Sequence, residues 1–158
     1  MSQDRTSTGF DASLGYLLKQ ATTALRTAMD AALRTCTLSV PQYSCLESLS
    51  RTPGQSNAQL ARGAFVTPQS MVGVLRGLQD RGLVARDDRP RSGRKMPSRL
   101  TPEGEELLSR ARIALAPVER RLLDAVGPGD HAVVIAALAG ITSAMNELTS
   151  LGRPPGSP

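Results

Sequence analysis

The fold of this chain is decided by the stretch Thr67-Pro-Gln-Ser-Met-Val-Gly-Val-Leu-Arg-Gly-Leu-Gln-Asp-Arg81. Thr67 and Pro68 form a helix start, because threonine caps a first turn and proline is tolerated as the first helical residue. Gly82, directly after the stretch, is a typical helix end. The apolar residues recur at steps of three and four, at Met71, Val74, Leu75 and Leu78. The pattern predicts an amphipathic helix over 67–81.

The opposite face of this predicted helix is small, polar and almost uncharged. Its members are Thr67, Gln69, Ser70, Gly73 and Arg76. Glutamine and serine can hydrogen-bond base edges in the major groove of DNA, and a helix N-terminus attracts phosphate. The face is typical of a recognition helix, and we take these five residues as candidate DNA contacts.

A shorter helix is predicted directly before it. Ser56-Asn-Ala-Gln59 follows a Pro-Gly turn and has the form of a capping box, which predicts a helix over 56–63. Residues 64–66 then separate the two helices, so the segment predicts a helix-turn-helix in which Ser56 and Gln59 are further candidate DNA contacts. Residues 83–86 and 98–100 predict a short β-hairpin behind it.

The positive charge of the chain is concentrated around this segment. The net charge is +5, yet the stretch from Arg62 to Arg99 holds nine basic and three acidic residues and so carries +6. The loop of the predicted hairpin contributes Arg89, Arg91, Arg94 and Lys95. An arginine on such a loop can enter a narrow minor groove, where the potential is most negative. A solvated basic hairpin or a contact with an acidic membrane are the alternatives.

Four further helices are predicted outside the basic segment, over 11–34, 41–51, 101–126 and 130–150, and the ends 1–10 and 152–158 are expected to be frayed. Pro117 should kink the helix in which it lies. The apolar faces of the terminal helices exceed what the basic segment can cover. We therefore expect these helices to pack on a second copy of the chain, with an intramolecular bundle as the alternative.

Length and composition restrict the class of protein. A chain of 158 residues with 40% hydrophobic and 21% charged residues is expected to form one globular domain. We find no apolar run near the roughly 18 residues that span a bilayer and no signal peptide, so we expect a cytoplasmic protein that does not enter a membrane. His131 is the only histidine, and the cysteines are two. These counts disfavour metal sites and the usual nucleophilic triads, so we expect no metal, no cofactor and no enzyme activity.

Several of these pieces together resemble a known family. Leu60-Ala61, Leu78-Gln-Asp-Arg-Gly-Leu-Val-Ala-Arg86, Gly93-Arg94 and Leu100-Thr-Pro-Glu-Gly104 are similar, in order and spacing, to the winged helix-turn-helix of MarR-type transcriptional regulators. The resemblance implies a mainly α fold with a short β-hairpin wing. It implies a DNA-binding lobe over 36–100, and a dimerisation region formed by the helices of 11–34 and 101–150.

The resemblance also implies a function. It suggests a homodimeric repressor that binds a pseudo-palindromic operator in double-stranded DNA and is relieved by a small-molecule effector. In this family Arg94 corresponds to the wing-tip arginine, and Gln69 and Ser70 correspond to base-facing positions. An effector pocket is expected where the helices of 11–34, 41–51 and 101–126 meet the DNA-binding lobe, with Met29, Leu33, Arg34 and Tyr43 as candidate contacts from the first two.

Two alternatives remain open at this point. Gly73 and Gly77 stand where the family often has basic residues, which favours a dimeric ligand-binding or interaction module with weak or nonspecific DNA binding. Cys36 and Cys45 leave a redox-sensing regulator open, provided that a thiol is exposed and has a lowered pKa. Inert thiols, with Cys45 as a small core residue, are the favoured interpretation.

Overall fold

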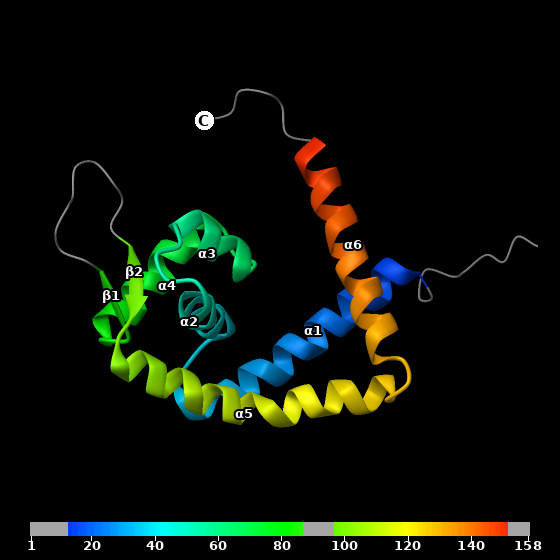
Figure 1. Ribbon diagram of the computed structural model, residues 1–158, viewed down its shortest axis with the longest axis horizontal. Helices are drawn as coiled ribbons and strands as arrows, with labels where there is room; N and C mark the ends of the chain where they lie inside the picture. Colours follow the sequence, from blue (N-terminus) through cyan, green and yellow to red (C-terminus); the bar gives the residue numbers. More distant parts are fainter. Residues whose placement is uncertain (1–12, 87–96, 152–158) are drawn as a thin grey trace, which may run out of the picture. The chain divides into compact units, whose positions relative to one another are not determined.

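The structure, a computed structural model, describes residues 13–86 and 97–151 (Figure 1). The expected tails 1–10 and 152–158 and the four basic loop residues Arg89, Arg91, Arg94 and Lys95 lie outside the described residues. The helices are α1 (Leu14–Leu33), α2 (Val40–Arg51), α3 (Asn57–Gly63), α4 (Pro68–Asp80), α5 (Pro102–Val126) and α6 (His131–Leu151). A 3-10 turn, Arg34–Cys36, follows α1, and the strands are β1 (Val84–Arg86) and β2 (Ser98–Leu100). The mainly α fold with a two-stranded hairpin is confirmed.

The helix starts follow from local capping chemistry. Ser39 and Ser56 each accept a hydrogen bond from the backbone N–H three residues on, and the side-chain oxygens of Gln42 and Gln59 accept one from the backbone N–H of the cap residue. These are two complete capping boxes, which satisfy donors that a helix start leaves unpaired. Only the α3 box was predicted from the sequence.

The segment from α2 to the hairpin folds around one apolar core. Figure 1 shows α2, α3, α4 and the hairpin gathered beside the first part of α5, and the helices α2, α3 and α4 all contact one another. The largest fully buried side chains are Leu33, Leu46, Leu49, Leu60, Met71, Leu78, Leu108 and Cys45. Each buried leucine stabilises the fold by about 1.5–3 kcal/mol relative to an exposed one. This core packs the buried face of α4 against α2 and α3.

The hairpin is tied to the start of α5. Strands β1 and β2 pair antiparallel with Val84 opposite Leu100. The Thr101 hydroxyl donates to the carbonyl of Gly82 at 2.6 Å and accepts from the N–H of Gly104 at 3.0 Å. Gly82 has φ 68°, a left-handed conformation that favours glycine. One threonine thus caps α5 and fixes the turn between α4 and β1.

The chain divides into two compact units, Met1–Val118 and Glu119–Pro158. Helix α5 runs on through Pro117, next to this division. In the second unit, the Nε2 atom of His131 lies 2.8 Å from the carbonyl oxygen of Leu123, so the imidazole joins the end of α5 to the start of α6.

Helix α6 corrects one expectation from the sequence. The window His131–Leu148 has a mean hydropathy of 1.3, and none of it is buried within the described chain. By length and composition this helix could cross a membrane, so the expectation that no segment reaches that threshold is wrong. Scattered Gly, Thr and Ser residues interrupt the apolar runs of α6. No single long apolar run is therefore visible in the sequence, although the mean hydropathy of the window is high. A single helix of this kind is weak evidence for a membrane, since a helix covered by a partner passes the same test.

Candidate nucleic-acid interface

The first turn of α4 is held by its own side chains. The Thr67 hydroxyl accepts from the N–H of Ser70 at 3.1 Å and donates to the Ser70 hydroxyl at 2.9 Å. Pro68 occupies the first helical position. Thr67 therefore has its hydroxyl engaged in the cap, while the Ser70 hydroxyl keeps its proton for an outside acceptor.

The two faces of α4 lie as the sequence pattern predicts. Met71, Leu75 and Leu78 are buried in the core. The solvent side is formed by Pro68, Gln69, Ser70, Val72, Gly73, Arg76 and Asp80. Between Pro68 and Leu75 the helix has no ionisable residue. A DNA groove would thus meet a neutral first half of the helix, followed by the guanidinium of Arg76.

Helix α3 is positioned by bonds that the candidate residues make to each other and to α4. The Ser56 hydroxyl accepts from the N–H of Gln59, and the Gln59 side-chain oxygen accepts from the N–H of Ser56 at 2.8 Å. The hydroxyl oxygen of Ser56 and the side-chain oxygen of Gln59 are therefore both used to cap the start of α3. The side-chain amide nitrogen of Asn57 donates to the carbonyl of Pro68 at 2.8 Å and so joins the starts of the two helices.

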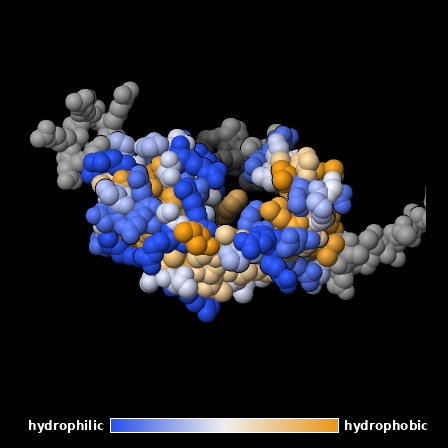
Figure 2. Space-filling view, turned by 60° about the horizontal axis from the view of Figure 1, so that its bottom comes forward, coloured by the Kyte–Doolittle hydropathy of each residue, from blue (hydrophilic) through white to orange (hydrophobic). Residues whose placement is uncertain are grey.

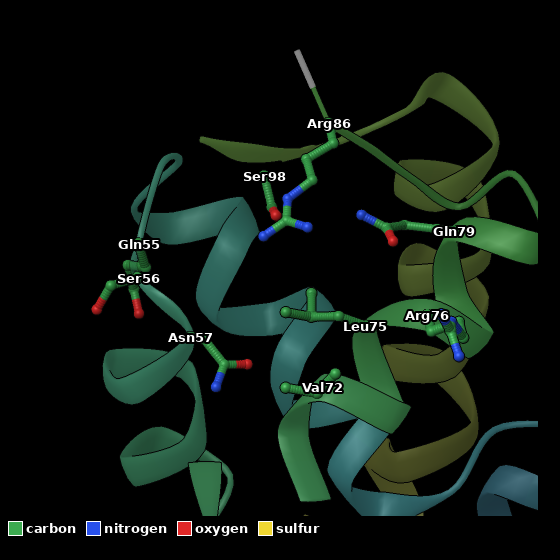
Figure 3. Close-up of a pocket in the computed structure, with 9 residues that line it drawn as sticks. All are labelled: Gln55, Ser56, Asn57, Val72, Leu75, Arg76, Gln79, Arg86 and Ser98. Atoms are coloured by element: carbon green, nitrogen blue, oxygen red, sulfur yellow. The ribbon is translucent and has the colours of Figure 1, made fainter. Parts of the chain in front are cut away.

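A pocket of about 480 Å³ lies between α3, α4 and the hairpin (Figure 3). Its lining residues are Gln55, Ser56, Asn57, Val72, Leu75, Arg76, Gln79, Arg86 and Ser98. Arg76 and Arg86 make it positive, and the buried Oδ1 atom of Asn57 finds no hydrogen-bond partner among residues 13–86 and 97–151. Two guanidinium groups at a pocket beside the exposed face of α4 suit a DNA backbone phosphate.

The hairpin contributes Arg86 and Ser98 to the edge of this pocket. Arg86 pairs with Ser98 across the two strands and is the last residue described before the loop. The carbonyl of Ser98 accepts from the N–H of Gly54, so the turn between α2 and α3 is joined to β2. Sequence reasoning missed Arg86 and Ser98; their place at the inner end of a basic hairpin loop was the available signal.

An ion pair joins α2 to α5. Glu47 accepts from the Nε atom of Arg112 at 2.9 Å and from its second nitrogen at 3.2 Å, and Arg51 adds a third bond at 2.9 Å. The bonds from Arg112 hold the pKa of the Glu47 carboxyl below its usual value. Burial, reinforced by the charge of Glu47, raises the pKa of the neighbouring Tyr43. Nothing in the local sequence signalled this pair.

The candidate effector contacts do not share one environment. Leu33 is fully buried in the core, and Met29 and Tyr43 are partly buried against it. Arg34 is exposed at the end of α1. Leu33 is therefore a core residue that a ligand at the surface does not reach. Met29, Arg34 and Tyr43 each keep exposed surface that a ligand could contact.

The cysteines lack the features that redox sensing needs. Cys36 and Cys45 are both buried and unpaired. Burial raises the pKa of the Cys45 thiol to about 12, the opposite of a reactive thiolate. Within residues 13–86 and 97–151, no cluster of three or more His, Cys, Asp or Glu side chains could hold a metal ion.

Comparisons with known proteins give the family. The sequence model of the MarR family matches residues 38–96. The HTH-type transcriptional repressor Rv2887 of Mycobacterium tuberculosis is 46% identical over 113 residues, which cover 72% of this chain and 81% of that protein. The transcriptional regulator HosA of Escherichia coli O111:H- is 32% identical over 74 residues, which cover 47% of this chain and 55% of that protein.

Solved structures agree with the sequence comparison. Rv2887 in complex with salicylic acid has a TM-score of 0.70 at 40% identity, and 84% of this chain and 98% of that chain are covered. Rv2887 in complex with DNA has a TM-score of 0.67 at 39% identity, with 83% and 98% covered. The transcriptional repressor CouR bound to a 23-mer DNA duplex has a TM-score of 0.76 at 26% identity, with 89% and 99% covered. The chain therefore belongs to the MarR family of winged helix-turn-helix transcriptional regulators.

Proposed function

We propose that this protein is a transcriptional repressor that binds a pseudo-palindromic operator in double-stranded DNA as a homodimer. The observation that carries the proposal is helix α4, which is capped at its start, neutral over its first half and followed by a basic hairpin. The names of two relatives support it: Rv2887 is a transcriptional repressor solved with DNA, and CouR is a transcriptional repressor bound to a DNA duplex.

The homodimer follows from apolar surface that the described part of one chain leaves uncovered. Figure 2 shows apolar residues in orange at the surface. The exposed large apolar side chains of α1, α5 and α6 are Leu14, Leu17, Ile113, Leu122, Leu123, Val133, Ile135, Leu138, Met145 and Leu148. A second copy of the chain would cover them, with residues 11–34 and 101–150 as the dimerisation region and 36–100 as the DNA-binding lobe. The two recognition helices would then enter successive major grooves, about 34–36 Å apart.

Each side chain of the interface has a role in this account. Gln69 and Ser70 face the base edges, while Arg76 and Arg86 bind phosphate beside the pocket between α4 and the hairpin. Gly73 lies between these groups on the exposed face. Arg94, with Arg89, Arg91 and Lys95, enters the flanking minor groove. These arginines supply the salt-dependent part of the affinity, and Gln69 and Ser70 supply part of the sequence preference.

A small molecule relieves the repression in this account. Rv2887 has been solved with salicylic acid and with p-aminosalicylic acid, which are aromatic carboxylates. Arg34, Met29 and Tyr43 offer a cation and apolar surface at the junction of α1 and α2 for such a ligand. Binding there would shift the population of dimers whose spacing fits DNA. The protein acts in the cytoplasm and catalyses no reaction.

The test is a selection from random duplex DNA with the purified full-length protein, repeated at several salt concentrations. The proposal expects enrichment of a pseudo-palindrome with half-sites about 10 base pairs apart and a steep fall of affinity with salt. Recovery of unenriched DNA that dissociates at modest salt would instead support the alternative, a dimeric module with only nonspecific DNA binding.

A further inference from the structure

Val72 is an apolar side chain on the face of α4 that meets DNA in the proposed function. It is 56% exposed, whereas its neighbour Met71 is fully buried. Figure 3 shows Val72 and Leu75 both on the side of α4 that faces the pocket. Leu75 is 7% exposed and belongs to the core, so Val72 is the apolar group that remains for an outside partner.

Gly73, next to Val72, has no use within the fold that the described residues reveal. A β-carbon added at Gly73 would meet no atom within 4 Å. Glycine also weakens a helix interior relative to alanine. Gly73 weakens the helix, and the packing of the described residues does not require a glycine there. We therefore take the missing side chain to allow the DNA to approach the helix backbone closely.

Gln69 lies one turn before Val72 on the same side of the helix. Glutamine pairs with adenine through two hydrogen bonds, and an apolar side chain contacts the 5-methyl group of thymine. Arginine and lysine, which read guanine, are absent from α4 until Arg76. The first half of α4 therefore has the chemistry to read A·T pairs and lacks a cation to read G·C pairs.

We propose that Val72 is a specificity-determining residue that contacts the 5-methyl group of a thymine in each half-site, with Gly73 admitting the helix to that depth. The inference rests on the proposed function, because it names what the recognition helix reads. It predicts an A·T step under Gln69 and Val72 in both halves of the operator.

The experiment removes the methyl group without changing the base pairing. The DNA pool enriched by the wild-type protein is copied once with dTTP and once with dUTP, and both copies are titrated with the same proteins. Burying one methyl group changes a binding constant by about fourfold. One such contact in each of two half-sites would change the affinity of the dimer for DNA by about fifteenfold. The wild type should bind the uracil copy more weakly by that factor. Val72→Ala should bind the two copies within about threefold of each other.

Two further variants separate the contact from general damage. Val72→Thr keeps a methyl group at the contact and should retain the preference for thymine. Gly73→Ala should unfold at the same or a higher temperature than the wild type, yet lose affinity for the thymine copy. Unchanged affinity of Gly73→Ala would remove the close approach from the proposal.

The outcomes distinguish this inference from the function on which it rests. If a pseudo-palindrome is enriched but the wild type binds both copies equally, the thymine contact is refuted and the repressor stands. The contact is also refuted if Val72→Ala keeps the whole preference. If no sequence is enriched, the proposed function fails, and this inference fails with it.

Discussion

Gly104, in the first turn of α5, lies so close to the backbone of Leu83 that a β-carbon on residue 104 would overlap the carbonyl oxygen of Leu83. That carbonyl also accepts the N–H of Thr101 at 3.1 Å, so the approach of α5 to the hairpin is fixed by backbone on both sides. Residue 104 must therefore be glycine if the first turn of α5 is to stay against Leu83.

Gly104→Ala should destabilise the protein by about 1–3 kcal/mol, since neither backbone segment can move away without breaking these bonds. Chemical denaturation of the purified protein measures the effect. Gly73→Ala is the matched control, because the added methyl group there meets open space. Equal stability of the two variants would show that α5 does not approach Leu83 this closely.

Phe65, in the turn between α3 and α4, combines strain with exposure. It has φ 55°, a left-handed conformation that costs a non-glycine residue about 1–2 kcal/mol. The side chain is 90% exposed, so it contributes little burial in return. Phe65→Gly should therefore raise the free energy of unfolding by about 0.5–1 kcal/mol, after the extra backbone entropy of glycine is subtracted.

Phe65→Ala is the control for this prediction. It removes the exposed ring but keeps the strained backbone. The unfolding temperature of Phe65→Ala should therefore stay near that of the wild type. A Phe65→Gly variant that is less stable than the wild type would show that the ring makes a contact worth more than the strain.

Glu47→Gln should lower the stability by about 1 kcal/mol at neutral pH, because the charge-assisted bonds to Arg112 and Arg51 are lost and the site is partly exposed. The pKa of Glu47 is lowered in the folded protein. The stabilisation is therefore present above the unfolded pKa, about 4.3, and is lost as the pH falls through the folded pKa.

Denaturation at pH 7 and at pH 3 checks this. The difference in the free energy of unfolding between the wild type and Glu47→Gln should be smaller at pH 3 than at pH 7. Asp30→Asn is the control, since the pair that Asp30 makes with Arg26 is exposed and 4.0 Å long. A difference that persists unchanged at pH 3 would show that the charge of Glu47 is not what stabilises the contact between α2 and α5.

Both thiols should resist modification in the folded protein. Cys45 is fully buried with a pKa of about 12, and Cys36 is 6% exposed. A thiol reagent at pH 8 should react with both only at the rate of unfolding, and Cys36→Ser should bind DNA as the wild type does. Rapid labelling of the native protein, accompanied by loss of DNA binding, would revive the redox-sensing alternative.

The sequence predicted those parts of the fold that depend on local chemistry. Thr67-Pro68, Gly82 and the Ser56 capping box each act within a few residues, and the helices and hairpin begin and end within three residues of the predicted positions. The predicted outward face of α4 was right for the same reason. The predicted roles of Arg94 and its neighbours stay predictions, because the loop lies outside the described residues.

Features that join distant parts of the chain could not be predicted in this way. Glu47 and Arg112 are 65 residues apart, and neither lies in a motif. Val72 belonged to neither the predicted inward stripe nor the predicted outward face of α4, and its 56% exposure in the structure is what brings it into the candidate site. The hydropathy of α6 was missed because polar residues interrupt its apolar runs.

The measurement that tests the central claim most directly is a salt titration of the binding of the full-length protein to its selected duplex and to a scrambled duplex of the same composition. The account predicts that, for both duplexes, the logarithm of the affinity falls linearly with the logarithm of the salt concentration. It also predicts that the selected duplex binds at least about a thousandfold more tightly than the scrambled one. Gln69→Ala should reduce that preference and leave the salt slope unchanged. Equal affinity for the two duplexes at every salt concentration would contradict the claim that this protein is a sequence-specific repressor.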